Sequence, residues 1–348
     1  DGVLTYDPGL SSDISSTGGE QDALAEYMFA NYPQSSPYDA EEEDVEDDER
    51  IVRTLRVLDQ DAPTFTNVLD VEVLGKFQVP GSVFGESAAE IPAFDEARDQ
   101  IFFTDANSDV VRVLDISDPS NPSLESTITL GGSPNSVAIF GDIVAVAVEV
   151  DPKQNPGKVE FYSADDFSKL GEVTVGALPD MVTFNEDGTK VLTANEGEPS
   201  GDYLTDPEGS VSIITLNTSD LSASTVATAD FKAFNTNIPA GVRVFGRSTA
   251  GEGDAADGFA TTLAQDIEPE YITISGNLAY VTCQENNALA IVNIENATVE
   301  SLLPLGTVDH SVEGNGLDAS NRDDSIYISQ WPIKGMYLPD AITSFESN

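Results

Sequence analysis

The sequence has few of the residues on which most catalytic centres depend. It holds one cysteine, one histidine and 15 basic residues against 62 acidic ones. A single cysteine excludes a disulfide within the chain, and a single histidine excludes the HExxH zinc motif and any centre with several histidines. The formal net charge of −47 makes nucleic acid and anionic lipid poor partners, because both would be repelled. It favours cations and a salt-rich extracellular setting.

Other familiar signals are also missing. No apolar run approaches the length of a membrane span. The glycine-rich segment 251–258 is acidic, which is the wrong sign for a phosphate cradle, and no G-x-S-x-G elbow occurs. His310 lies in a polar segment, which disfavours a Ser-His-Asp triad, and Cys283 lies in an apolar strand, which predicts a buried side chain. The chain begins at Asp1, which we interpret as the removal of a leader.

What the sequence does contain is a repeat. MVTF at 181–184, KVLTAN at 190–195 and SVSIITL at 210–216 alternate apolar and polar residues, as the strands of an antiparallel meander do. Similar phrases recur, so that 46 residues separate Phe94 from Phe140 and 44 separate Phe140 from Phe184. A unit of about 40–50 residues with four strands is typical of a β-propeller blade. Two stacked sandwich domains would not produce one opening phrase at a near-constant interval.

We therefore predict an all-β fold, a propeller of four-stranded antiparallel blades. The expected blades cover about 88–132, 133–176, 177–231 and 267–306, and a fifth begins at 338–342. Segment 232–266 is rich in Gly, Ala and Asp and is predicted to be an insertion, and 307–338 a long loop. Four blades with partial ends leave sheet edges open. The chain is thus expected to be incomplete alone, either as part of a longer propeller or with another chain completing the ring.

The N-terminal region has a different character. Residues 1–50 end in the acidic run 41–49 and are predicted to be a largely extended or disordered tail, in which 23–32 is a candidate short helix. Residues 51–348 are assigned to the propeller. Within 51–79 the segment VLDVEVLGKFQV resembles the fourth strand of a blade, and such a strand commonly completes the last blade of a ring.

Three segments carry a family resemblance. They are TANEGEPSGDYLTDPEGSVSII (193–214), DIEPEYITISGNLAYVTCQENNALAIVNI (266–294) and DHSVEGNGLDASNRDDSIYISQWPIKGMYLPDAI (309–342). The chain resembles the choice-of-anchor I domain over about 88–348, a group that includes mesenchyme-specific cell-surface glycoproteins. The resemblance implies a secreted or surface-attached propeller, often seven-bladed, whose sequence continues past the PDAI phrase. Some members are labelled alkaline phosphatases, although these motifs do not explain such chemistry.

Acidic residues recur at the start of the strands that would line the axis. Asp180, Glu270 and Asp340 occupy equivalent positions, with Asn135 in the second blade and Glu90 one place further along in the first. A ring of carboxylates is a natural Ca²⁺ site, and mutual repulsion would raise some of their pKa values without a cation. The alternative is that these side chains cap turns by accepting backbone N–H groups.

A second acidic set is expected on one face, from strand ends and loops: Glu196, Glu198, Asp202, Asp206, Glu208 and Glu285, with Glu149, Asn195, Asp105 and Asn107. Asp318 and Asp323 lie in a segment with the alternating oxygens of some Ca²⁺ loops, although Asp and Gly are also ordinary turn residues. Trp331 and Tyr337 are expected to seat their loop rather than stack on a sugar.

Two functions remain open at this level. The first is a non-enzymatic extracellular or cell-surface propeller, a binding or structural module stabilised by Ca²⁺ and assembling with other chains. The second is a Ca²⁺-dependent phosphoesterase that resembles an alkaline phosphatase. Two N-glycosylation sequons, at Asn217 and Asn296, fit the extracellular setting.

Overall fold

The computed structural model describes residues 72–82, 89–245, 261–320, 322 and 325–345. They divide into two compact units, of which one contains residues 309–334 and the other contains 72–308 and 335–348. The predicted tail 1–50, its candidate helix and segment 51–71 lie outside the described residues.

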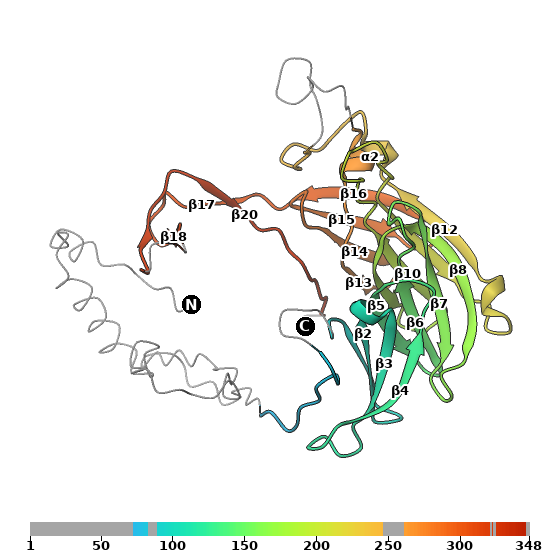
Figure 1. The fold of residues 1–348 in the computed structure, drawn as a ribbon. Coiled ribbons are helices and arrows are strands. Elements are labelled where there is room, and N and C mark those ends of the chain that lie inside the picture. Colours follow the sequence, from blue (N-terminus) through green and yellow to red (C-terminus); the bar gives the residue numbers. More distant parts are fainter. Residues whose placement is uncertain (1–71, 83–88, 246–260, 321, 323–324, 346–348) are drawn as a thin grey trace, which may run out of the picture. The chain divides into compact units, whose positions relative to one another are not determined.

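Four antiparallel sheets of four strands make up most of the larger unit (Figure 1). Their strands are, in chain order, β1 (Pro92–Asp95), β2 (Gln100–Asp105), β3 (Val110–Asp115) and β4 (Ser123–Thr129); β5 (Pro134–Phe140), β6 (Ile143–Val148), β7 (Pro156–Ser163) and β8 (Lys169–Ala177); β9 (Pro179–Phe184), β10 (Lys190–Asn195), β11 (Ser210–Thr215) and β12 (Thr225–Asp230); β13 (Ile272–Ser275), β14 (Leu278–Cys283), β15 (Ala288–Asn293) and β16 (Thr298–Pro304). Each sheet follows sequence order without a crossover, and the four sheets lie in the segments where blades were predicted.

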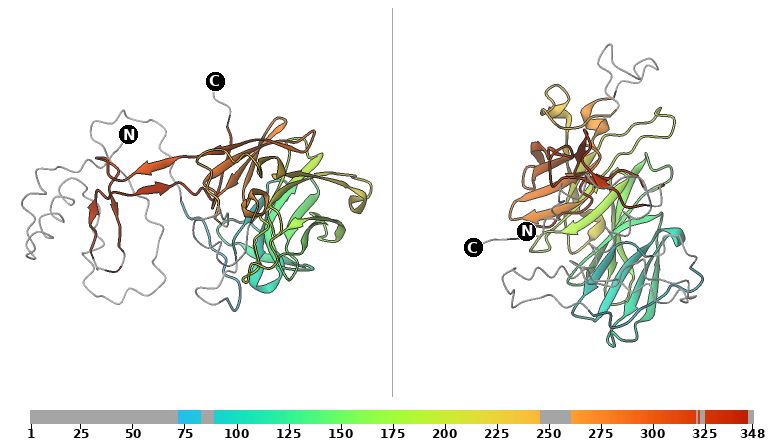
Figure 2. Two further views of the ribbon diagram at one scale, coloured as in Figure 1. Left: turned by 90° about the horizontal axis from the view of Figure 1, so that it is seen from above. Right: turned by 90° about the vertical axis from the view of Figure 1, so that its left-hand side faces the viewer.

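The sheets pack face to face in succession, as blades of a propeller do. Separate apolar clusters fill the spaces between the first and second, second and third, and third and fourth sheets. The first strands β1, β5, β9 and β13 contact one another in turn, so the leading strand of each blade is the innermost. Figure 2 gives two further views of this succession. The chain is a β-propeller module, as its repeat predicted.

Strand composition explains the packing. β6 reads IVAVAV, and because successive side chains point to opposite faces, Val144 and Val146 pack toward the first blade while Ala145 and Ala147 pack toward the third. Cys283 is buried at the end of β14 and forms no disulfide. A strand that is apolar on both faces fits a blade with neighbours on both sides.

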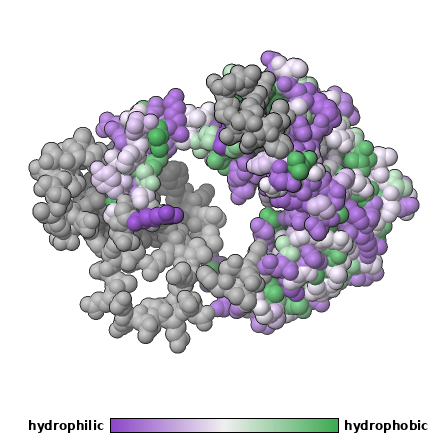
Figure 3. All heavy atoms as spheres, turned by 45° about the horizontal axis from the view of Figure 1, so that its top comes forward, coloured by the Kyte–Doolittle hydropathy of each residue, from purple (hydrophilic) through white to green (hydrophobic). Residues whose placement is uncertain are grey.

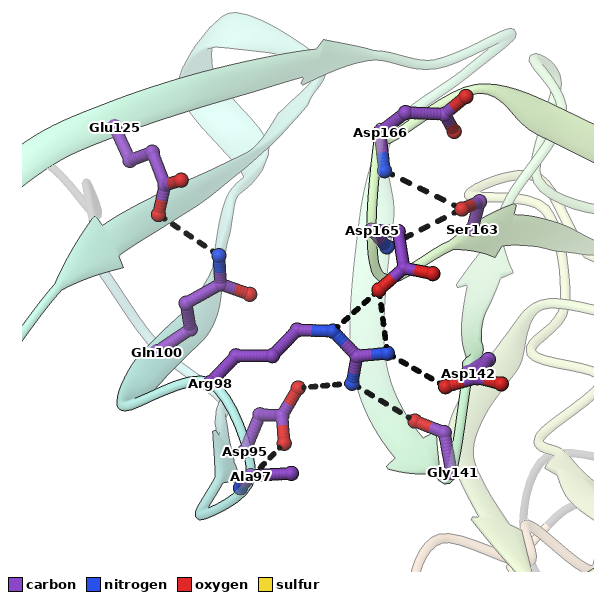
Figure 4. Close-up of polar contacts among 10 residues, drawn as sticks. All are labelled: Asp95, Ala97, Arg98, Gln100, Glu125, Gly141, Asp142, Ser163, Asp165 and Asp166. Atoms are coloured by element: carbon purple, nitrogen blue, oxygen red, sulfur yellow. Dashed lines mark hydrogen bonds and ion pairs between the residues drawn. The ribbon is translucent and has the colours of Figure 1, made fainter.

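A polar clasp joins the first two blades outside the apolar cluster (Figure 4). Arg98, in the turn between β1 and β2, forms ion pairs with Asp95 of its own blade and with Asp142 and Asp165 of the second, at 2.6–2.8 Å. It also donates to the carbonyl of Gly141. The guanidinium fork thus holds the turns of two blades together.

The ends of the propeller region differ from the prediction. Of the strand proposed within 51–79, the described part, 72–79, forms no strand. A strand needs a neighbour with which to exchange hydrogen bonds, and none pairs with it among the described residues. The predicted start of a fifth blade also forms no strand, but Ser344 bonds through its N–H and hydroxyl to Thr273 and Ile274 of β13.

The remaining elements are short. In the third blade η3 (Leu221–Ala223) precedes β12, and η4 (Lys232–Phe234) and the capped helix α2 (Leu263–Asp266) lie in the predicted insertion, whose described part contains no strand. The 3-10 turn η2 (Ala106–Ser108) follows β2. In the predicted long loop, β17 (Thr307–Asp309) pairs with β20 (Lys334–Met336), and β18 (Leu317–Asp318) with β19 (Ile328–Ser329).

One face of the first blade lacks a neighbour among the described sheets. Phe94, Ile101, Leu114 and Leu124 are successive cross-strand partners on the face turned away from the second blade. Phe94 is 57% exposed and Leu124 40%. These four residues form an apolar row whose two end members, Phe94 and Leu124, are exposed to solvent, whereas Leu114 within it is 7% exposed.

Candidate functional site

The backbone at the start of β13 places Glu270 beside the end of β14. The Glu270 N–H donates to the carbonyl of Thr282, and Tyr271 and Thr282 exchange further bonds. The first blade has the same arrangement, in which Glu90 N–H donates to Thr104. Glu90 is therefore the direct equivalent of Glu270 and does not lie one place further along.

Asp180 and Asp340 follow a repeated Leu-Pro step. Leu178 and Leu338 both adopt positive φ values, 48° and 45°, which are uncommon for a residue with a branched side chain. The same unusual backbone in both copies supports the sequence equivalence of the two aspartates. Asn135, the equivalent in the second blade, instead donates its amide to the carbonyl of Pro179 and so ties two inner strands together.

Four acids from the third and fourth blades gather at this end of the inner strands. Asp180 lies on β9, Glu196 directly follows β10, Glu270 precedes β13, and Glu285 follows β14. We call these four residues the acidic cluster. Backbone bonds fix Glu196 through its N–H to the carbonyl of Leu178. The sequence predicted two separate acidic sets, one from strand starts and one from strand ends. The structure instead brings Asp180 and Glu270 of the first set close to Glu196 and Glu285 of the second.

The pKa values of Glu270 and Glu196 show that the acids of the cluster repel one another. Burial, and next the charges of Glu285 and Glu196, raise the pKa of Glu270 to about 9. Burial, and next the charges of Asp180 and Glu268, raise the pKa of Glu196 to about 8. Both acids thus resist ionisation at neutral pH.

Acids around the cluster extend the negative region. The pKa of Asp180 rises to about 6, from burial and then from the charges of Glu90 and Asp340. The pKa of Glu268 rises to about 7, from burial and then from Glu285. The charge of Glu149, directly after β6, also raises the pKa of Asp180, so charges from all four blades and from Asp340 converge here.

In the described part of the chain, the acids of the cluster are not neutralised by ion pairs. Among the described residues, the four cluster acids form no ion pair with lysine or arginine. Lys153 lowers the pKa of Glu196 but pairs with Glu198. One carboxylate oxygen each of Glu270 and Glu285 is buried without a hydrogen-bond partner. In the part of the chain that the structure describes, no three His, Cys, Asp or Glu side chains form a ready-made metal site.

Other acids of the predicted face have local roles. Asp202 accepts bonds from Ser200 and Leu204 within its own turn, Asp206 accepts from Thr261, and Glu208 pairs with Lys232 at 2.5 Å. Asp202 matches the alternative that loop acids cap turns, whereas Asp206 and Glu208 contact side chains from other segments. Asp105 pairs with Arg112.

The unit that contains 309–334 is organised by its own contacts. Asp318 accepts from the N–H groups of Ser320 and Tyr327, and Asp323 lies outside the described residues. Trp331 donates its indole N–H to the carbonyl of Leu317, and His310 shares a bond with the carbonyl of Asn315. Tyr337, in the larger unit, donates its N–H to Asn287.

Sequence reasoning missed two contributors. Glu268 precedes the conspicuous Pro269-Glu270 pair, and its N–H is held by the buried Asn286. Lys153 comes from the loop after β6, and nothing in its local sequence indicates that it lies near acids of the third blade. The sequon residues Asn217 and Asn296 are both exposed, and their glycosylation stays a prediction.

The family model of the choice-of-anchor I domain matches residues 90–348. The chain belongs to the choice-of-anchor I family. No curated protein matches it. No helix among its described residues is long and apolar enough to cross a membrane.

Solved structures of low similarity match part of this choice-of-anchor I domain. A nidogen/laminin complex has a chain with 14% identity and a TM-score of 0.39, with 64% of this chain and 65% of that one covered. A protein from Lactobacillus plantarum has 18% identity and a TM-score of 0.43, with 62% and 57% covered. BamB from Moraxella catarrhalis has 15% identity and a TM-score of 0.36, with 61% and 51% covered. The domain thus spans less than two thirds of each, and we draw no function from them.

Proposed function

We propose that this choice-of-anchor I domain acts outside the cell, secreted or at the cell surface, as a binding and structural β-propeller rather than as an enzyme. The observation that carries the proposal is the acidic cluster at the inner ends of the blades, which no basic side chain of the described residues pairs. Membership of the family, the acidic composition and the two exposed sequon asparagines support the extracellular placement.

The sign of the charge decides which ligands suit this site. A desolvated group of carboxylates repels phosphate, nucleic acid and anionic lipid and attracts cations. In Figure 3, hydrophilic residues cover most of the described surface in view, and apolar residues form separate small patches. An acidic surface with an acidic centre fits cation-dependent binding better than the turnover of an anionic substrate.

Assembly with a further β-sheet is the structural half of the proposal. The apolar row Phe94–Ile101–Leu114–Leu124 is the kind of face that each of the other blades buries against a neighbour. We propose that a sheet of a further copy of this chain packs on it, because burial of exposed apolar area is the main favourable term in association.

Light scattering after size exclusion tests this assembly. The chain is expected to associate as its concentration rises, and Phe94→Glu to reduce association because it places a charge in the apolar row. Leu204→Glu is the matched control, since Leu204 is 73% exposed in a loop of the third blade. A chain that stays monomeric at every concentration, or equal effects of both substitutions, contradicts the assembly.

The acidic cluster also permits the second candidate function, in which several cations offset the charge of a phosphate ester. Hydrolysis of p-nitrophenyl phosphate, measured with Ca²⁺ and with chelator, separates the two. The binding module predicts no turnover in either condition. Turnover that disappears with chelator and with Asp180→Ala or Glu270→Ala establishes the phosphoesterase instead.

A further inference from the structure

The carboxyl groups of Glu270 and Glu285 make an unusual contact. They come from the same blade, one before β13 and one after β14, and they lie close enough for a hydrogen bond between them. Two ionised carboxylates only accept hydrogen bonds, so this contact is favourable only when a proton or a cation lies between them.

Both carboxyl groups of this contact have an oxygen that is buried from solvent. Glu270 is 9% exposed, and its Oε2 has no hydrogen-bond partner; the Oε2 of Glu285 is likewise buried and unpartnered. Burying an ionised group without a partner is strongly unfavourable. The charges that act most strongly on Glu270 belong to the acidic cluster itself, namely Glu285, Glu196 and Asp180. Its side chain is therefore turned into the cluster.

We propose that Glu270 and Glu285 are the central pair of ligands of a Ca²⁺ site that Asp180 and Glu196 complete. All four donors are carboxylate oxygens, which hard cations prefer, and neither the histidine nor the buried Cys283 thiol of the described residues is part of the cluster. Ca²⁺ takes six to eight oxygens in flexible geometry and accepts backbone carbonyls and water among them.

The cation would act as a bridge between two blades. Asp180 and Glu196 belong to the third blade, and Glu270 and Glu285 to the fourth. Like charges separate when nothing lies between them, so we expect Asp180 and Glu196 to turn toward the pair when the ion binds. An ion held by both blades stabilises the folded chain, because it binds the folded state and not the unfolded one.

This inference rests on the proposed function for its biological meaning, but its test requires neither a partner nor an activity. The chain is stripped with chelator, dialysed and titrated with CaCl₂ by calorimetry at about physiological ionic strength, where non-specific attraction to the −47 charge is screened. Saturable binding is expected, with a rise in melting temperature that is larger for Ca²⁺ than for Mg²⁺.

The double substitution Glu270→Gln with Glu285→Gln is expected to raise the melting temperature in chelator but to abolish its increase on addition of Ca²⁺. In chelator its melting temperature is expected to exceed that of the wild type, since the buried repulsion is gone. With Ca²⁺ it is expected to show no rise and no saturable binding. Glu186→Gln with Glu295→Gln removes the same charge from two exposed turns and should leave both responses unchanged.

Three results would overturn the site. The first is an absence of saturable Ca²⁺ binding by the wild type, and the second is saturable binding retained by the folded Glu270→Gln/Glu285→Gln chain. The third is an equal loss of Ca²⁺ binding in the control chain Glu186→Gln/Glu295→Gln. Failure of the proposed binding function would appear elsewhere, as phosphate ester turnover or as an invariant monomer, so the two failures are distinguishable.

Discussion

Arg98 shows how much of the contact between two blades can depend on one side chain. It is one of 15 basic residues in a chain with 62 acidic ones, and three aspartates share it. The bonds to Asp95, Asp142 and Asp165 raise the already high pKa of the guanidinium further. Asp142 and Asp165 are largely exposed, whereas Asp95 is 6% exposed. The pair with Asp95 therefore determines the stability that the clasp contributes.

Replacing Arg98 tests how much the ion pair with Asp95 contributes to stability. Arg98→Ala leaves the buried carboxylate of Asp95 with only the N–H of Ala97, and we expect a loss of about 1–3 kcal/mol in the free energy of unfolding, as for a buried polar group left unsatisfied. Urea denaturation measures it. Asp142→Asn removes an exposed partner and should cost no more than about 1 kcal/mol. Equal losses in the two variants would mean that the exposed pairs dominate.

The backbones of two segments approach each other closely at Gly209 and Ile267. A Cβ built at Gly209, just before β11, would lie 1.9 Å from the carbonyl oxygen of Ile267, in the segment that leads to the fourth blade. The Gly209 N–H also donates to the carbonyl of Ala264. Only glycine permits this contact, which fixes the approach of residues 267–270 to the third blade and thereby the position of Glu270.

Gly209→Ala is therefore expected to destabilise the chain. The free energy of unfolding should fall by about 1–3 kcal/mol or more, the range for overpacking a close-packed site. The added Cβ would contact backbone, which moves less easily than a side chain. The midpoint of urea unfolding measures it. Gly201→Ala is the control, since nothing lies within 4 Å of its added Cβ, and it should change the midpoint little. Similar midpoints for both variants would show that the approach can relax.

Over the whole molecule, the excess of acid predicts how stability depends on pH. The pKa values of Glu270 and Glu196 are raised to about 9 and about 8 in the folded chain, from an ordinary 4.5. Between the ordinary and the raised values, the folded state binds more protons than the unfolded state, so the free energy of unfolding falls as pH rises. The stability is fully present below pH of about 4.5 and is lost as pH rises through about 8–9.

Thermal unfolding in chelator from pH 5 to 9 measures this dependence. We expect the melting temperature to fall across the range, and to fall less steeply in Glu270→Gln/Glu285→Gln, which lacks two of the repelling charges. The Glu186→Gln/Glu295→Gln chain should follow the wild type, because those acids are exposed in turns. A melting temperature that rises toward pH 9 in chelator would contradict the sign.

The order and pairing of strands within a blade follow from the local sequence. Alternating strands, turn residues and spacings of 44 and 46 residues predicted the four sheets and the leading strand as the innermost, because period-2 patterns and local turns fix an antiparallel meander without long-range information. The sequence also predicted that acids at the starts of the axis-lining strands, such as Asp180 and Glu270, would lie near one another, since every blade repeats the same geometry.

Tertiary structure alone decided which acids meet. Glu198 and Glu208 resemble Glu196 in sequence, but each pairs with a lysine from another segment, Lys153 or Lys232. Glu268 joined the acids around the cluster because Asn286 holds its backbone. Residues 72–79 formed no strand, because no described segment pairs with them. Such outcomes depend on contacts between residues far apart in the chain, whose partners are fixed only when the blades pack.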